Sequence, residues 1–307
     1  MLFTLYGDYA YPQGADLWLG SLVELAGALG VSEVAVRSAV ARLAREGWLE
    51  ARRAGNRSYY GLAMAGRRLI EEGTRRIYVP RGAWSGRWCL LTYSIPESKR
   101  AHRDRIRKRL AWLGFGSIGG GTYVSPRDVA SEAQALAAEH GVGEFARVFS
   151  AALVAPQQNA TLAAQCWDLP GIAARYRAFI EHYSPLFSRD RRRHRDGSLP
   201  DRDAFAVRFA LTHDFRRFPF IDPDLPTSLL PKNWTGARAR DLFRRYHDLL
   251  ERGAVRFFSS VASGARPGSR RRRGRLYARG APPLRTSRAA GRAGIFRPAR
   301  RASTPAP

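Results

Sequence analysis

The chain has 307 residues, of which 45% are hydrophobic, which is enough for a sizeable core and for more than one domain. Its apolar runs fall short of the roughly 20 residues of a membrane helix, and its first residues lack the pattern of a signal peptide. Cys89 and Cys166 are too far apart for a disulfide scaffold or zinc ribbon. We therefore expect a cytoplasmic protein without a membrane partner. The net charge of +26 predicts a polyanionic partner instead, although the excess of arginine over lysine also fits the coding bias of a GC-rich genome.

Residues 1–79 are predicted to form a winged helix-turn-helix domain. The apolar residues of segment 19–30 recur at helical spacing, and Ser32 then offers an N-cap for a second helix that ends at Gly47. Gly55-Asn56 follows between two short strand-forming stretches, which is typical of the tip of a β-hairpin. Two helices followed by a hairpin are the elements of a winged DNA-binding domain.

The second helix and the hairpin are rich in arginine. Val36, Val40 and Leu43 recur at the spacing of a buried stripe, so the polar residues between them face outward. Arg37 and Ser38 occupy early positions from which recognition helices read base edges, and the other arginines would reach backbone phosphates. The expected DNA-binding residues are Ser32, Arg37, Ser38, Arg42, Arg45, Arg52, Arg53 and Arg57. The alternative is a protein–protein module with a solvated basic face.

Residues 84–155, after the linker 80–86, are predicted to form a second domain. The strand-forming stretch "RWCLLTYSIP" precedes a helix over 99–113, a glycine-rich loop, a strand near 122–125, a helix over 129–140 and a last strand in "FARVFSAALV". This order predicts a ferredoxin-like sandwich of the βαββαβ type. The expected fold class of the whole chain is therefore α+β.

Residues 156–263 are predicted to be a helical domain for effector binding and dimerisation. Apolar periodicity indicates helices over 166–187, 204–218 and 236–261. The charged segment between the first two, "SRDRRRHRDGSLPDRD", is predicted to be a mobile, solvated loop. Residues 264–307 contain 13 arginines and no acidic residue, and are predicted to be a disordered basic tail.

Three blocks of the sequence, in the same order, resemble the PaaX family, repressors of phenylacetic acid catabolism. They include "LYGDYAYPQGADLWLGSLVELAGALG", "WSGRWCLLTYSIP" with "LAWLGFGSIGGGTYVSP", and "HDFRRFPFIDPDLPTSLLPKNWTGARARDLFRRYHDLL", and span about Leu2 to Val261. The resemblance implies a bacterial repressor of aromatic catabolic genes that is usually a homodimer. It also implies binding to a palindromic double-stranded DNA operator, and release when an aryl-CoA thioester such as phenylacetyl-CoA binds.

The effector implied by this resemblance combines anionic phosphates with an apolar acyl group, so its site needs cations beside an aromatic pocket. His213, Arg216 and Arg217 precede aromatic residues, and Trp234 follows a proline-rich connection. We expect these four residues to bind the effector. The alternative is structural, with Trp234 and the neighbouring phenylalanines only holding the connection in place.

Enzymatic functions fit the sequence less well. The middle segment is similar to small CRISPR-associated nucleases, but Ser94 stands where their metal-binding Asp would be, and a hydroxyl is a poor Mg²⁺ ligand. Neither a phosphate-binding GK[ST] loop nor a nucleophile–base pair suited to CoA-ester chemistry is recognisable, so we expect no cofactor, metal or catalytic residue. A second function stays open: a non-specific, architectural nucleic-acid-binding protein, whose binding would depend strongly on salt and little on sequence.

Overall fold

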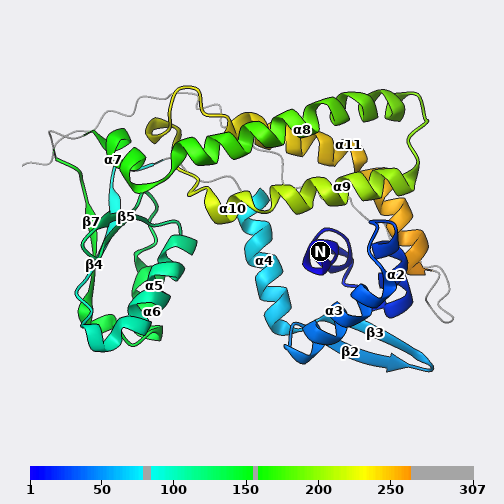
Figure 1. Ribbon diagram of the computed structural model, residues 1–307, viewed down its shortest axis with the longest axis horizontal. Helices are drawn as coiled ribbons and strands as arrows, with labels where there is room; N and C mark the ends of the chain where they lie inside the picture. The colour runs from blue at the N-terminus through cyan, green and yellow to red at the C-terminus, as the bar shows by residue number, and fades with distance from the viewer. Residues whose placement is uncertain (79–83, 155–157, 264–307) are drawn as a thin grey trace, which may run out of the picture. The chain divides into compact units, whose positions relative to one another are not determined.

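The computed structural model describes residues 1–78, 84–154 and 158–263 (Figure 1). The predicted tail, 264–307, lies outside the described residues, as does part of the predicted linker, 80–86. The described residues combine helices with two small antiparallel sheets, in agreement with a mixed fold of helices and sheets. No helix within these ranges is both long and apolar enough to cross a membrane.

The first part of the chain has two helices followed by a hairpin, at the positions predicted. Its elements are α1 (Leu2–Leu5), β1 (Leu17–Trp18), α2 (Leu19–Gly27), α3 (Glu33–Arg45), β2 (Leu49–Ala54), β3 (Arg57–Leu62) and α4 (Met64–Tyr78). Gly30 precedes α3 and Gly47 follows it, with φ of 77° and 74°, a backbone region that favours glycine. Gly55, with φ of 59°, turns the hairpin between β2 and β3, and the sheet order is β1-β3-β2.

The residues before β1 form a helical segment that the sequence periodicity did not predict. α1 continues into a π-helical stretch, Tyr6–Ala10, and a 3-10 turn, Tyr11–Gln13. The segment buries side chains on several sides, so it lacks the single apolar stripe by which surface helices are recognised. Tyr6 donates a hydrogen bond from its hydroxyl to the Tyr60 carbonyl at 2.7 Å, which ties this segment to β3.

The middle part of the chain has the element order strand–helix–strand–strand–helix–strand. Its elements are β4 (Trp88–Tyr93), a 3-10 turn (Glu97–Lys99), α5 (Arg100–Trp112), β5 (Gly116–Gly119), β6 (Thr122–Ser125), α6 (Ala130–Glu139), a 3-10 turn (Gly143–Phe145) and β7 (Ala146–Ala151). β5 lies within the stretch expected to be a loop. It forms an antiparallel hairpin with β6 because Gly119, Gly120 and Gly121 all have positive φ. The sheet order is β5-β6-β4-β7, with every pair antiparallel.

The two faces of this sheet pack against different parts of the chain. Leu91 belongs to the core formed with α5 and α6, where Ile106 and Leu136 are buried. Trp88 and Val124 belong to another core, formed with the helices that follow the sheet. The sheet therefore lies between its own helices and the C-terminal part of the chain.

The C-terminal part of the chain is helical, as predicted. Its elements are α7 (Asn159–Cys166), α8 (Leu169–Arg195), α9 (Asp201–Phe215), α10 (Phe218–Ile221), a 3-10 turn (Thr227–Leu229) and α11 (Gly236–Ser263). The prediction of a solvated loop over 188–203 was wrong, because α8 continues to Arg195 and α9 begins at Asp201. The segment between these two helices is correspondingly short.

Asp190 explains why this charged segment is helical. Its side chain is completely buried and accepts a hydrogen bond from the Tyr246 hydroxyl of α11 at 2.5 Å. Arg189 and Arg193 form ion pairs with the same carboxylate at 2.8 and 3.5 Å. Burial raises the pKa of Asp190, but the hydrogen bonds from Arg189 and Tyr246 outweigh it and leave the pKa below its usual value. The arginines of this charged segment therefore pair with a buried carboxylate, and the segment is not simply solvated.

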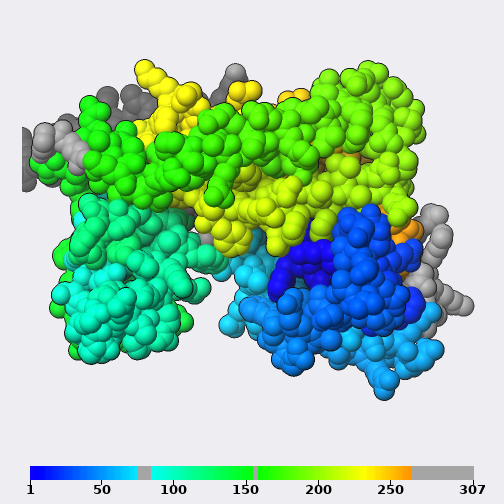
Figure 2. Space-filling view, in the orientation of Figure 1, coloured from blue at the N-terminus to red at the C-terminus, as the bar shows by residue number. Residues whose placement is uncertain are grey.

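One hydrophobic core joins the start of the chain to its last helix. Tyr9 stacks on Phe258 of α11 and packs against Phe205 of α9, with ring centroids 5.3 and 5.1 Å apart. The Ser21 hydroxyl donates to the Val261 carbonyl at 3.0 Å. In Figure 2 the dark-blue N-terminal residues lie against the yellow-green residues of α9. The described residues form one compact unit, and the domain boundaries at 79, 84 and 155 stay predictions.

Candidate nucleic-acid interface and ligand cavity

Helix α3 presents a polar face because its apolar residues point into the core. Val36 and Val40 are buried, and the Ser32 hydroxyl accepts a hydrogen bond from the Ala35 amide at 3.4 Å, so it caps the helix as predicted. The predicted DNA-binding residues of this helix are all exposed: Ser32, Arg37, Ser38, Arg42 and Arg45. The structure therefore brings these residues together on the outward side of α3.

Arg37 has a partner on its own helix. Its Nε donates to Glu33 Oε1 at 2.7 Å, and both side chains are more than half exposed. An exposed pair of this kind contributes only about 0.3–0.5 kcal/mol, so a stronger bidentate acceptor can displace Glu33. In the structure the pair places the guanidinium along the first turn of α3.

Val34 is an exposed apolar residue on the same face. It is 78% exposed, although valine is usually buried. Arg37 and Ser38 follow it by three and four residues, so the three side chains are neighbours on the helix surface. Val34 is not among the DNA-binding residues predicted from the sequence, although a valine outside the buried stripe of Val36 and Val40 indicates an exposed apolar side chain.

The hairpin follows α3 along the chain, and its first strand, β2, contacts that helix (Figure 1). Arg52 and Arg53 are exposed on β2, whereas Arg57 on β3 is half-buried with its guanidinium 4.6 Å from the Trp18 ring centroid. Arg52 lies 5.3 Å from the Tyr59 ring centroid and 3.4 Å from Asp16. Aromatic side chains thus position two of the three hairpin cations.

His213, one of the four residues predicted to bind the effector, contacts the start of the chain. Its Nδ1 is 3.0 Å from the Thr4 hydroxyl of α1, and its ring stacks on Phe209 with centroids 5.8 Å apart. Burial and nearby positive charge, including that of Arg216, lower the pKa of His213 to about 4. The imidazole is therefore neutral at pH 7.

The other three residues of that prediction lie in two places. Arg216 is half-buried at the end of α9, and Arg217 is exposed just before α10. Trp234 instead packs on Tyr176 of α8, with ring centroids 5.9 Å apart. The structure brings His213, Arg216 and Arg217 to one end of α9, while Trp234 belongs to an aromatic core with Tyr176.

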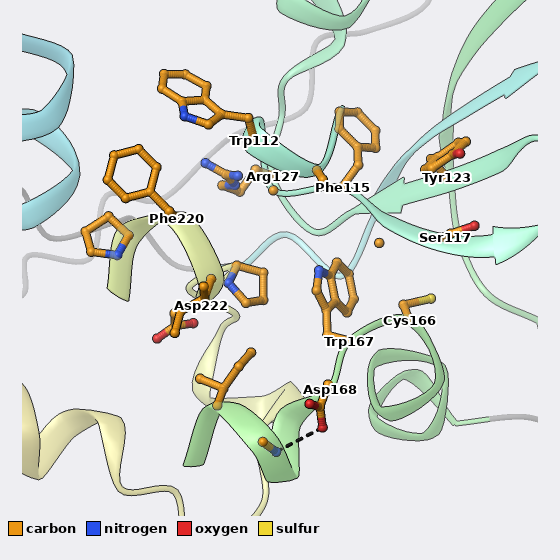
Figure 3. Close-up of a pocket in the computed structure, with 18 of the residues that line it drawn as sticks. Trp112, Phe115, Ser117, Tyr123, Arg127, Cys166, Trp167, Asp168, Phe220 and Asp222 are labelled. Atoms are coloured by element: carbon orange, nitrogen blue, oxygen red, sulfur yellow. Dashed lines mark hydrogen bonds between the residues drawn. The ribbon is translucent and has the colours of Figure 1, made fainter. Parts of the chain in front are cut away.

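A cavity of about 600 Å³ lies where the middle sheet meets the C-terminal helices (Figure 3). Its walls come from the end of α5, from β5 and β6, from the turn between α7 and α8, and from α10. The aromatic residues of the lining are Trp112, Phe115, Tyr123, Trp167 and Phe220. Its cations are Arg107, Arg127 and Arg175. The described lining includes none of the four residues expected to bind the effector.

The two carboxylates in the lining are engaged in structural hydrogen bonds. Asp168 accepts from the Gly171 amide at 2.9 Å, which caps α8. Asp222 accepts from the Tyr176 hydroxyl at 2.5 Å and from Arg240 at 2.9 Å. The remaining charge on the wall is cationic, so the cavity combines aromatic surface with arginine.

The cavity could not be located from any one stretch of sequence. Its lining combines residues 107–127, 166–175 and 219–223, which are adjacent only in the folded chain. Gly116 is one position where the residue type reflects the close packing of the cavity wall. A Cβ atom there would lie 2.6 Å from the Cys166 Cβ and 2.7 Å from the Trp167 ring. In the parts of the chain that the structure describes, no group of three His, Cys, Asp or Glu residues is arranged to hold a metal ion.

Comparisons with known proteins agree on one family over nearly the whole chain. Residues 1–66 match the PaaX-like protein family, residues 81–163 the PaaX protein central Cas2-like domain, and residues 167–260 the PaaX-like protein C-terminal domain. The transcriptional repressor PaaX of Escherichia coli (strain K12) is 35% identical over 279 residues, which cover 88% of this chain and 87% of that protein.

A solved structure supports the same fold. The uncharacterized protein Rv0674 from Mycobacterium tuberculosis aligns with a TM-score of 0.51 at 22% identity, covering 76% of this chain and 88% of that one. This similarity concerns the fold alone. Because the family matches follow one another along the chain and the curated relative spans almost all of it, the chain belongs to the PaaX family.

Proposed function

We propose that this chain is a transcriptional repressor whose N-terminal part is a winged helix-turn-helix that binds a DNA operator. The observation that carries the proposal is the outward face of α3, on which arginine and serine side chains gather beside an arginine-rich hairpin. Membership of the PaaX family supports it, because the curated relative is a transcriptional repressor. A regulator of this kind acts in the cytoplasm and needs no catalytic residue.

In this proposal α3 enters the major groove. Arg37 and Ser38 read base edges near the start of the helix, as recognition helices do. Arg42 and Arg45 bind the phosphate backbone, and the hairpin adds Arg52, Arg53 and Arg57 as a wing along the neighbouring phosphates. The stacking of Arg57 on Trp18 supports this role, since an ordered cation loses less entropy on binding.

The proposed control of the repressor is the one that the resemblance to the PaaX family implies. Two copies of the chain would place two recognition helices in successive major grooves of a palindromic operator. An aryl-CoA thioester such as phenylacetyl-CoA would favour a state with lower DNA affinity, so aromatic catabolic genes would be released when their substrate is present. The identity of the target genes and the identity of the effector are both part of this proposal.

The test is a titration of the full-length protein onto DNA from upstream of its own gene and onto a scrambled duplex at physiological ionic strength. We expect tight binding to the upstream DNA, weak binding to the scrambled duplex, and release from the upstream DNA by phenylacetyl-CoA. Mass measurement of the complex at saturation gives the number of chains per operator. Operator binding that the thioester leaves unchanged would contradict the effector part of the proposal.

A second candidate is an architectural protein that binds nucleic acid without sequence preference. The net charge of +26 favours it, because non-specific affinity depends on phosphate neutralisation. In that case both duplexes would bind equally, with the same steep dependence on salt. Equal affinities in the titration would select this function over the repressor.

A further inference from the structure

We infer that α5 is a second DNA-binding surface, which contacts backbone phosphates beyond those that α3 and the hairpin reach. Its contact residues are Arg105, Lys108 and Arg109, which we call the α5 stripe. The surface extends the proposed function, on which this inference rests, because that function assigns the DNA contacts to the N-terminal part alone. Four features of the helix carry the inference: the concentration of its charge, the alignment of three cations, the surroundings of these cations and the place where the helix ends.

Positive charge is concentrated on α5. Six of its 13 residues are arginine or lysine, and one, Asp104, is acidic. The helix α6, which lies beside α5 (Figure 1), contains two glutamates and no lysine or arginine. A coding bias toward arginine would act on both helices alike. The difference between them therefore indicates that the charge of α5 serves a local purpose.

The α5 stripe lies along one side of the helix. Ile106 and Leu110 are buried in the core that α5 forms with the sheet, so the polar residues between them face outward. Arg105, Lys108 and Arg109 are spaced by three and four positions and are all exposed, which makes them neighbours on the helix surface. Like charges at this spacing destabilise a helix. A polyanion bound along this side would remove the repulsion between them.

The surroundings of the α5 stripe leave its charges available to phosphate. Within the described residues, none of its three side chains forms an ion pair, whereas the other arginines of α5 pair with acidic residues at N–O distances of 3.0–3.7 Å. Arg109 lies 5.5 Å from the ring centroid of Trp112, and the Arg105 Nε donates to the Ala101 carbonyl at 3.1 Å. These contacts orient both guanidiniums and leave further N–H groups for a phosphate.

The end of α5 is connected to the N-terminal part of the chain through α10. Trp112, the last residue of α5, lies beside Phe220 of α10 with ring centroids 6.4 Å apart. α10 also contacts α4, the helix that follows the hairpin. Because α4 has 15 residues, it is about 22 Å long. Along this connection the α5 stripe lies within roughly 40 Å of the hairpin, little more than one turn of B-DNA. A duplex bound by α3 and the hairpin has its next turn of phosphates at this distance.

Double-stranded DNA fits this surface better than a protein partner does. Protein interfaces are built around aromatic and apolar side chains, with charged residues depleted at the centre. Among the described residues, the large apolar side chains that are exposed lie outside α5. Phosphate binding needs cations alone, and contacts of this kind hold a protein in position on the duplex without reading its sequence.

The experiment compares the full-length wild type with Arg105→Gln/Lys108→Gln/Arg109→Gln, which removes the three charges of the α5 stripe. Affinity for the upstream DNA and for a scrambled duplex is measured by fluorescence anisotropy at several salt concentrations. The slope of log K against log salt gives the number of phosphates that the protein neutralises, because each contact changes the slope by about 0.9. Thermal unfolding checks that the variant is folded.

Two further variants serve as controls. Arg105→Lys/Arg109→Lys keeps the charge of the α5 stripe and should keep the slope of the wild type. A second triple variant removes the same number of exposed charges from α8, so it reproduces the change in net charge without altering α5. Its substitutions are Arg177→Gln, Arg191→Gln and Arg192→Gln.

We expect the stripe variant to lower the magnitude of the salt slope by about 2.7 on both duplexes, and the α8 variant to leave the slope unchanged. Phosphate ethylation interference on the upstream DNA should locate the lost contacts. The phosphates that matter for the wild type but not for the stripe variant should lie about one helical turn from those that Arg53→Gln loses.

Failure of this inference and failure of the proposed function give different results. If the stripe variant and the α8 variant lower the slope equally, the effect is one of net charge and the inference is overturned. It is also overturned if the stripe variant keeps the slope of the wild type. In both cases the repressor proposal stands as long as the upstream DNA binds more tightly than the scrambled duplex. If the wild type binds both duplexes equally and only the stripe variant lowers the slope, the α5 stripe binds DNA and the sequence-specific repressor fails.

Discussion

Arg37 and Arg53 are both exposed arginines, but they have different surroundings. Arg37 lies on α3 beside Ser38, where a bidentate contact to a base is possible, whereas Arg53 lies on β2 opposite Ser58. We expect Arg37→Ala to cost about 1–3 kcal/mol on the operator and little on scrambled DNA. Arg53→Ala should weaken both duplexes alike and lower the salt dependence. Titrations of each variant at several salt concentrations separate the two roles, and equal losses on both duplexes for Arg37→Ala would count against base reading.

If α3 enters the major groove as proposed, Val34 gives a prediction about the kind of base beside it. An exposed valine beside Arg37 and Ser38 can pack on the 5-methyl group of thymine in the major groove. Replacing thymines of the operator by deoxyuridine, one at a time, should identify a position where the lost methyl costs about 0.8 kcal/mol. Val34→Ser should lose this sensitivity at that position only. A variant that keeps the full sensitivity would show that Val34 contacts no thymine methyl.

His213 gives a prediction about pH. Its pKa is lowered to about 4 in the folded chain, whereas an unfolded histidine titrates near 6.5. As the pH falls, the unfolded chain therefore binds a proton on this histidine before the folded chain does. The contribution of neutral His213 to folding stability is complete above about pH 6.5 and is lost as the pH falls toward 4. Thermal unfolding should show a larger fall in Tm from pH 7 to pH 5 for the wild type than for His213→Gln.

His194→Gln is the matched control for this measurement, because His194 is exposed at the end of α8. Its Tm should fall with pH as in the wild type. If His213→Gln and the wild type lose the same Tm, then protonation of His213 does not limit acid stability.

Among the helices, one buried acid of α8, Asp190, is hydrogen-bonded to α11. Tyr246→Phe removes the hydroxyl that donates to Asp190 and leaves a buried carboxylate with one partner fewer. We expect a loss of about 1–3 kcal/mol in the free energy of unfolding, measured by urea denaturation. Arg195→Gln, which breaks the exposed pair with Asp196, should cost less than about 1 kcal/mol. Similar losses for the two variants would mean that the buried hydrogen bond contributes no more to stability than the exposed ion pair.

Elements with a local signal were predictable from the sequence, and elements that depend on distant contacts were not. Ser32 and the stripe of Val36 and Val40 predicted α3 because the N-cap and the buried residues lie within one short stretch of sequence. The sequence around Asp190 gave the wrong prediction, since nothing nearby reveals that Tyr246 will bury it. The same reason hid the cavity, whose walls come from three separate stretches that are adjacent only in the folded chain.

At the scale of the whole molecule, the part that carries α3 has no core to itself. Phe258 of α11 is fully buried against Tyr9, more than 200 positions away in the sequence. We expect Phe258→Ala to cost about 3–5 kcal/mol and to lower the Tm of a single unfolding transition seen by both circular dichroism and loss of DNA binding. Phe257→Ala is a control at the neighbouring, partly exposed position. Separate transitions for the two signals would show that the N-terminal part folds independently.

This shared core also has a consequence during synthesis. The residues that complete the packing around Tyr9 and Ser21 include Phe258 and Val261, close to the end of the described chain. Because domains generally fold as units during translation, a nascent chain cannot complete the packing of its N-terminal part until residues up to Val261 have left the ribosome. Truncated products of interrupted translation would thus contain the complete sequence of α3 and the hairpin yet lack the core, so under the proposed function they would not compete with intact chains for the operator.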